Sequence, residues 1–116
     1  QDEAHKAFVE NYRARFGEDP KMGSLVGYNT FKAIAAGIDK AGSTDTEAMI
    51  AAMEGLEFDT PIGTLTFRPS DHQATMGAWV GRTTVEGGTP KMVDWTYHPG
   101  GDFLPPADAV KAMRPE

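Results

Sequence analysis

Asp71 and His72 are the only carboxylate and imidazole that stand next to each other in the sequence. A carboxylate that orients an imidazole is the arrangement of a general base, so this pair is the candidate for hydrolytic chemistry. Adjacent residues on a strand point to opposite faces, however, and the pair needs a bend in the chain before one side chain can orient the other. The sequence therefore favours a structural turn, or a hydrogen bond between two parts of the protein, over catalysis at this point.

The other histidines and the serines lack the context that catalysis or metal binding requires. His5 and His98 are far apart, without the i, i+4 spacing of a helical metal site. Ser24 and Ser70 have no Gly-x-Ser-x-Gly motif around them, and the sequence has no cysteine. We therefore expect no catalytic residue, no metal and no cofactor.

Two further motifs have structural explanations. Gly23 and Gly27 open a helix without the Lys-Ser/Thr pair of a phosphate-binding loop, so close helix packing explains them better. Trp79 and Trp95 have the side chains of a sugar-stacking platform, but on alternating strands such residues more often belong to a core or an interface.

Composition limits the class of protein. The 116 residues are 40% apolar and 24% charged, which fits one globular domain. Acidic residues number 17 against 11 basic ones, so the net charge is −6 and the clustered basic residues of a nucleic-acid surface are missing. No apolar stretch approaches the about 20 residues of a membrane span.

In the first half of the sequence, apolar residues recur every three or four positions, which is the spacing of a helix. A first helix is predicted to end at Gly17, before Pro20, and a second helix spans about 23–41, with Gly42 as its C-cap. The second helix has one apolar face and one face of small residues. We expect the face of small residues to lie against a sheet. A third helix should begin with a capping box formed by Thr44 and Glu47 and end near Gly55. We expect it to bury Met49, Ile50, Met53 and Leu56.

In the second half of the sequence, apolar and polar residues alternate with the period of two that is typical of strands. A strand is predicted over 63–67, and a hairpin over 78–95 with its turn at 86–89. The proline-rich tail should be irregular apart from a short helix at 107–113.

The order of these signals resembles the C-terminal third of a type I periplasmic solute-binding protein of the branched-chain amino acid family, which serves ABC transporters. The most specific part is the string Phe58–Gly63 followed by Phe67–Gln73. Further matching pieces are Ala7–Val9, Tyr12, Phe16-Gly17, Pro20, Gly27-Tyr28, Lys40–Asp45, Glu54–Glu57 and Val80–Arg82. The resemblance covers roughly residues 4–95 and leaves the tail unmatched.

The resemblance implies an α/β fold that is a fragment of a two-lobed protein, with three helices followed by strands and a hairpin. Residues 1–70 would belong to the first lobe, 71–77 to the crossing between lobes, and 78–116 to the second lobe. The parallel strands of the first lobe are missing, and the sequence starts with Gln1, so we expect a segment of a longer protein. Such a segment should self-associate or depend on a partner fragment.

The resemblance also implies a ligand site. The family places an aromatic side chain against the ligand just before the Gly-Tyr pair, and here that position is Gly23, flanked by Met22 and Ser24. We take Met22, Gly23 and Ser24 as candidate ligand-binding residues. An open glycine suggests a bulkier ligand or other contacts, although Gly23 is as well explained as the start of a helix.

Function follows from the same resemblance. It implies capture of an amino acid, or a related carboxylic or aromatic acid, for an ABC importer. The membrane permease of that importer would recognise the binding protein with its two lobes closed around the ligand. Asp71, His72 and Gln73 would lie at the hinge, and the protein would be exported to the periplasm or the extracellular space. Two alternatives remain: a ligand-sensing receptor or regulator domain of the same fold, and a hydrolase that uses Asp71 and His72.

Overall fold

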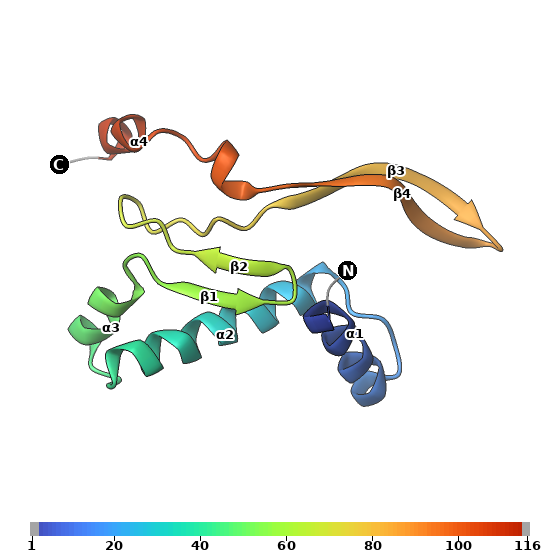
Figure 1. The fold of residues 1–116 in the computed structure, drawn as a ribbon, viewed down its shortest axis with the longest axis horizontal. Coiled ribbons are helices and arrows are strands. Elements are labelled where there is room, and N and C mark those ends of the chain that lie inside the picture. Colours follow the sequence, from blue (N-terminus) through green and yellow to red (C-terminus); the bar gives the residue numbers. More distant parts are fainter. Residues whose placement is uncertain (1–2, 115–116) are drawn as a thin grey trace.

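The computed structural model describes residues 3–114, which form four α-helices, one 3-10 turn and four strands (Figure 1). The elements are α1 (Glu3–Phe16), α2 (Met22–Ala41), α3 (Thr46–Met53), β1 (Glu57–Thr60), β2 (Gly63–Thr66), β3 (Ala78–Glu86), β4 (Thr89–His98), the 3-10 turn Gly100–Phe103, and α4 (Ala107–Met113). The strands pair as two separate antiparallel sheets, β1 with β2 and β3 with β4.

The first two helices begin and end close to where the sequence places them. Gly17 after α1 and Gly42 after α2 both adopt the left-handed conformation, with φ of 72° and 60°. The amide of Gly42 donates to the carbonyl of Ile38, which closes the last turn of α2. Glycine is favoured at both positions because a Cβ is strained at positive φ.

The small-residue face of α2 is its buried face, as expected. Asn29, Ala33 and Gly37 are buried, and Ala33 joins Leu56, Phe58 and Leu65 in the core beneath β1 and β2. The apolar face is largely open instead, with Phe31 75% exposed. The helix therefore packs closely on its sheet while its largest side chains remain uncovered by the described residues.

The start of α3 differs from the predicted capping box. The N-cap is Asp45, whose Oδ1 accepts from the amides of Glu47 and Ala48, each at 3.1 Å. Asp45 is one residue closer to the helix than Thr44, and its carboxylate also meets the positive end of the helix dipole. Met53 and Leu56 reach the core, whereas Ile50 is 49% exposed, so its predicted burial is wrong.

The strand β1 was not recognised in the sequence, although its partner was. Phe58 pairs with Leu65 and Asp59 with Thr64 across a tight turn at Pro61 and Ile62. β1 alternates between exposed and buried residues, but it has only 4 residues, too short for a clear period of two.

The hairpin forms as predicted but is longer. Gly87 and Gly88 form its turn with φ of 56° and 80°, and β4 continues to His98 rather than ending near Trp95. A β-bulge follows Val80. Between the pairs Val80–Thr96 and Arg82–Val93, β4 contains one residue more than β3.

Two glycines allow two segments of the chain to approach each other closely next to the Ala78–His98 end of the hairpin. A Cβ on Gly77 would lie 2.1 Å from the carbonyl oxygen of His98, and a Cβ on Gly100 would lie 2.2 Å from that of Met76. After this close approach the tail forms α4 over the predicted residues.

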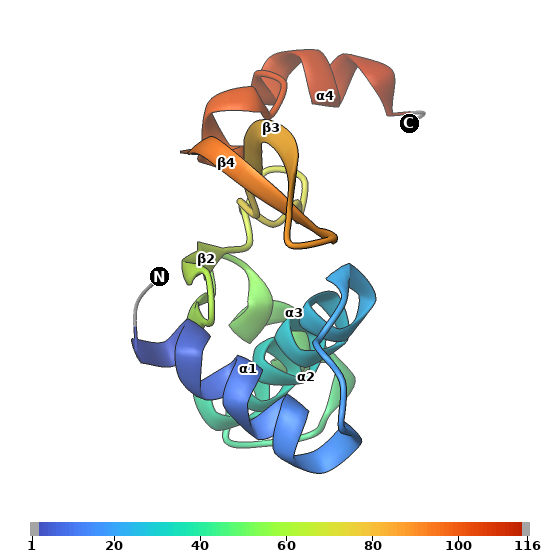
Figure 2. The ribbon, with the colours of Figure 1, turned by 90° about the vertical axis from the view of Figure 1, so that its right-hand side faces the viewer.

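The molecule is elongated. Its radius of gyration is 17.1 Å, whereas a compact domain of this length would have about 13 Å. The helices with β1 and β2 lie on one side, and the hairpin with α4 lies on the other (Figures 1 and 2). Among residues 3–114, no helix has the length and apolar character needed to cross a membrane.

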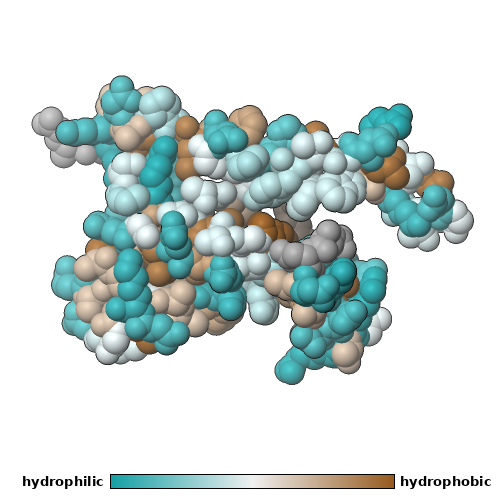
Figure 3. Space-filling model, in the orientation of Figure 1, coloured by the Kyte–Doolittle hydropathy of each residue, from teal (hydrophilic) through white to brown (hydrophobic). Residues whose placement is uncertain are grey.

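Apolar side chains are exposed on both parts, including the far end of the hairpin (Figure 3). The most exposed large ones are Met22, Phe31, Val85, Phe103 and Met113. No large side chain in the described part of the chain is completely buried.

Candidate functional site

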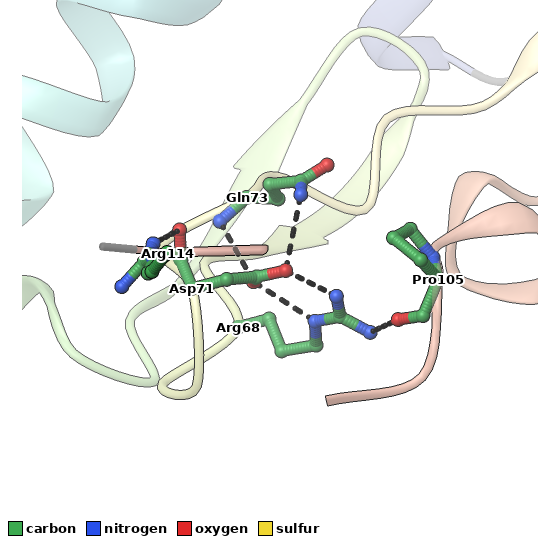
Figure 4. Close-up of polar contacts among 5 residues, drawn as sticks. All are labelled: Arg68, Asp71, Gln73, Pro105 and Arg114. Atoms are coloured by element: carbon green, nitrogen blue, oxygen red, sulfur yellow. Dashed lines mark hydrogen bonds and ion pairs between the residues drawn. The ribbon is translucent and has the colours of Figure 1, made fainter. Parts of the chain in front are cut away.

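Asp71 is the centre of a polar cluster in the loop that follows β2 (Figure 4). Its side chain is only 1% exposed. Oδ1 accepts from Arg68 Nε at 2.9 Å and from the Gln73 amide at 3.2 Å. Oδ2 accepts from Gln73 Nε2 at 3.0 Å and pairs with the second arm of the Arg68 guanidinium. The buried carboxylate is therefore fully paired, as a buried charge must be.

The same cluster reaches the end of the chain. The third nitrogen of the Arg68 guanidinium, Nη1, donates to the carbonyl oxygen of Pro105 at 2.8 Å. Arg114 Nη2 donates to the backbone carbonyl of Asp71 at 3.1 Å. The loop after β2 and the segment around α4 are thus joined by hydrogen bonds between residues 37 and 43 positions apart.

Electrostatics keep this carboxyl ionised. The hydrogen bond from Arg68 lowers the pKa of Asp71 to about 2, and the Gln73 amide adds to the effect while burial opposes it. The same contact raises the pKa of Arg68. At neutral pH Asp71 can accept hydrogen bonds but cannot supply a proton.

His72 turns away from this cluster. It adopts φ of 62°, and its side chain is 59% exposed with Nε2 3.5 Å from Glu54 Oε1. The loop therefore brings Asp71 and Gln73 together and separates His72 from them. The Asp71 carboxylate is occupied by Arg68 and Gln73, so it does not orient the His72 imidazole.

Met22, Gly23 and Ser24 form the first turn of α2. Met22 is 82% exposed, and a Cβ on Gly23 would meet no atom within 4 Å. Ser24 Oγ accepts from the amide of Lys21 at 3.2 Å, so it holds the helix start in place. Met22 also borders a depression of about 500 Å³ between α1 and α2.

The hairpin carries an aromatic cluster. Trp79 and Trp95 meet edge to face with ring centroids 4.7 Å apart, and Tyr97 lies 4.8 Å from Trp79. Both indoles are about half exposed, which fits a surface that another element covers better than it fits a closed core. Among the described residues, no group of three or more His, Asp or Glu side chains is placed to hold a metal ion.

Two members of the Asp71 cluster escaped sequence reasoning. Arg68 had a signal, because Arg-Pro-Ser-Asp places opposite charges three residues apart around a proline turn. Arg114 had none, because its contact with Asp71 spans 43 positions.

The model of the family described as periplasmic binding protein matches residues 1–90. The chain belongs to this family. The chain is similar to the curated Leu-, Ile-, Val-, Thr- and Ala-binding protein of Pseudomonas aeruginosa, with 34% identity over 67 residues. These 67 residues make up 58% of this chain and 18% of that protein. This periplasmic binding protein chain therefore spans about a fifth of that relative's length.

Solved structures of ABC-transporter proteins are also similar to this chain. A branched-chain amino acid ABC-type transporter protein of Rhodopseudomonas palustris is 33% identical, with a TM-score of 0.74 over 84% of this chain and 27% of that one. A solute-binding protein of R. palustris, solved with 3,4-dihydroxybenzoic acid, is 22% identical with a TM-score of 0.72, over 82% of this chain and 26% of its own, and supports the fold alone. The α/β fold is accordingly part of the larger type I periplasmic binding protein fold.

Proposed function

We propose that this chain is part of a solute-binding protein that captures an amino acid, or a related carboxylic or aromatic acid, for an ABC importer. The observation that carries the proposal is the family match over residues 1–90, together with relatives whose names state ABC transport or amino-acid binding. In such a protein two lobes close around the solute, and binding shifts the population toward the closed form.

The first turn of α2 is the part of this chain that would meet the ligand. Amide groups in the first turn of a helix carry the positive end of the helix dipole, which favours a carboxylate. The Ser24 amide already donates to the Lys21 carbonyl oxygen at 3.0 Å, so the amides of Met22 and Gly23 are the candidates. Met22 and Ser24 flank the open position at Gly23, where the absence of a side chain leaves room for a larger ligand. We therefore propose Met22, Gly23 and Ser24 as ligand contacts.

The loop Asp71–Gln73 is proposed as the hinge. It lies between β2 and β3, and its buried carboxylate fixes one conformation through Arg68 and Gln73. His72 remains free to change partners when the lobes move, because its side chain faces outward beside Glu54. Polar groups at such a crossing satisfy backbone and side-chain atoms that closure would otherwise strand.

Location and partners follow from the family. We propose a periplasmic or extracellular protein whose closed form contacts the ABC permease in the membrane. The exposed apolar side chains and the small share of its relatives that the chain spans support a further proposal: alone, the 116 residues self-associate or bind a partner fragment.

A ligand screen tests the proposal. The two-lobed protein that carries this sequence would be heated with single amino acids and with aromatic acids such as 3,4-dihydroxybenzoic acid. A ligand at 100 times its Kd adds about 2.7 kcal/mol to the free energy of unfolding, which gives a clear rise in Tm. If no solute in these classes raises Tm, the proposed function is wrong.

A further inference from the structure

We propose that Arg68, Asp71 and Arg114 form a latch that holds the C-terminal segment Leu104–Arg114 on the loop Arg68–Gln73. The latch couples two conformational states: α4 stays docked only while the loop keeps its present conformation. This inference rests on the contacts of these residues and not on the ligand or on transport.

Arg68 is the bridging residue. Its guanidinium donates from Nε and Nη2 to the Asp71 carboxylate and from Nη1 to the carbonyl of Pro105. A planar guanidinium can hold a carboxylate with one edge and a carbonyl with another, whereas a lysine ammonium is a single point of charge. Lysine at position 68 would therefore keep the ion pair with Asp71 and lose the bond to the C-terminal segment.

Arg114 closes the latch from the other end of α4. It donates to the backbone carbonyl of Asp71 at 3.1 Å, so Asp71 is bound through both its side chain and its main chain. Pro105 and Arg114 lie on either side of α4, and both reach the same loop. A change in the loop backbone would break both contacts together.

Few other contacts hold α4. The helix has 7 residues, too few to be stable by itself in water. Val110 is its one buried residue. The close backbone approach at Gly77 and Gly100 fixes the chain only as far as the start of the 3-10 turn. The position of α4 therefore depends on the latch together with Val110.

The chain suits a distance measurement because it contains no cysteine. Spin labels would be attached at Ser70→Cys in the loop and Ala112→Cys on the exposed side of α4, and their distance distribution recorded by pulsed electron spin resonance. A second pair, Ser70→Cys with Asp39→Cys, reports the distance from the loop to α2. Each pair is measured in Arg68→Lys, Arg114→Gln and the control Arg82→Gln, whose ion pair with Asp94 is on the exposed hairpin.

The latch predicts that the distribution between residues 70 and 112 broadens at least about twofold in Arg68→Lys and in Arg114→Gln, because local opening replaces a docked state. The distribution between residues 70 and 39 should stay as narrow as in the parent chain, and Arg82→Gln should change neither. An unchanged 70 to 112 distribution in both latch variants would overturn the proposal. Equal broadening of both pairs would also overturn it, since that indicates general loosening.

Discussion

His72 Nε2 lies 3.5 Å from Glu54 Oε1, while the carboxylate of Asp71, the residue before it, is held by Arg68 and Gln73. Two neighbours that could have formed a catalytic pair therefore serve different partners. Asp71 organises the loop internally, and His72 faces outward from it. This division makes the two residues separable by mutation.

The Asp71 cluster should make stability depend on pH in the acid range. Its folded pKa of about 2 lies below the ordinary value of about 3.9. The stabilisation is therefore complete above about pH 4 to 5 and is lost as the pH falls through 2. Urea unfolding at several pH values should show a difference between the parent chain and Asp71→Asn that shrinks toward pH 2.

The exposed carboxylate Asp94 provides the control. It pairs with Arg82 at the surface, where an ion pair contributes little, so Asp94→Asn should unfold like the parent chain at each pH. A constant difference between Asp71→Asn and the parent from pH 7 to pH 2 would contradict the assignment of the low pKa to Asp71.

Two adjacent glycines should respond very differently to substitution. A Cβ on Gly100 would lie 2.2 Å from the Met76 carbonyl oxygen, whereas on Gly101 its nearest contact is a methyl group of Thr75 at 3.8 Å. Because the first clash is with backbone, Gly100→Ala should cost about 1–3 kcal/mol of unfolding free energy, and Gly101→Ala much less. Fluorescence of the two hairpin tryptophans during unfolding measures both free energies, and equal losses would refute the close approach of Gly100 to Met76.

The packing of α2 on α3 gives a second matched pair. A Cβ on Gly37 would lie 3.0 Å and 3.2 Å from the terminal methyl groups of Met53 and Met49, whereas one on Gly27 meets nothing within 4 Å. Gly37→Leu should destabilise the helices by about 1–3 kcal/mol through overpacking. Gly27→Leu should be neutral or slightly stabilising, because leucine has the higher helix propensity. Unfolding followed by circular dichroism compares them; a Gly37→Leu variant as stable as Gly27→Leu would disprove this packing.

Local signals predicted much of the fold. Gly42 marks the end of α2 because a left-handed C-cap needs no tertiary contact, and Gly87 with Gly88 marks the hairpin for the same reason. Asp45 was missed because Thr44 offers an equally good local motif, and only the actual hydrogen bonds to α3 decide between them. The short strand β1 forms chiefly through its pairing with β2 and its packing against α2. A sequence of four residues reveals neither contact.

The candidate site was predicted less completely. The sequence located Asp71 and Gln73, and it placed His72 with them although the loop turns that side chain outward. The contact with Arg114 depends on how the tail returns to the loop, and no local pattern encodes that return. The role of Met22, Gly23 and Ser24 remains a prediction, because a ligand cleft needs two complete lobes.

Gly23 offers a test of the ligand site that separates structure from function. Because no described residue lies within 4 Å of a Cβ at position 23, Gly23→Phe should leave the stability of the isolated chain nearly unchanged. The new ring would fill the space proposed for the ligand, so affinity for a bulky aromatic acid should fall by about tenfold or more, equivalent to about 1.4 kcal/mol. Equal affinities in the parent protein and Gly23→Phe would remove Gly23 from the site.

Titration calorimetry of the two-lobed protein beside the isolated 116-residue chain tests the central claim most directly. We predict that the two-lobed protein binds an amino acid or an aromatic acid with a Kd of about 1 μM, or about −8 kcal/mol. The isolated chain should bind none of them, because a ligand cleft needs two complete lobes and the parallel strands expected for the first lobe are missing from this sequence. Micromolar binding by the isolated chain, or turnover of a solute by the two-lobed protein that disappears in His72→Ala, would contradict the account.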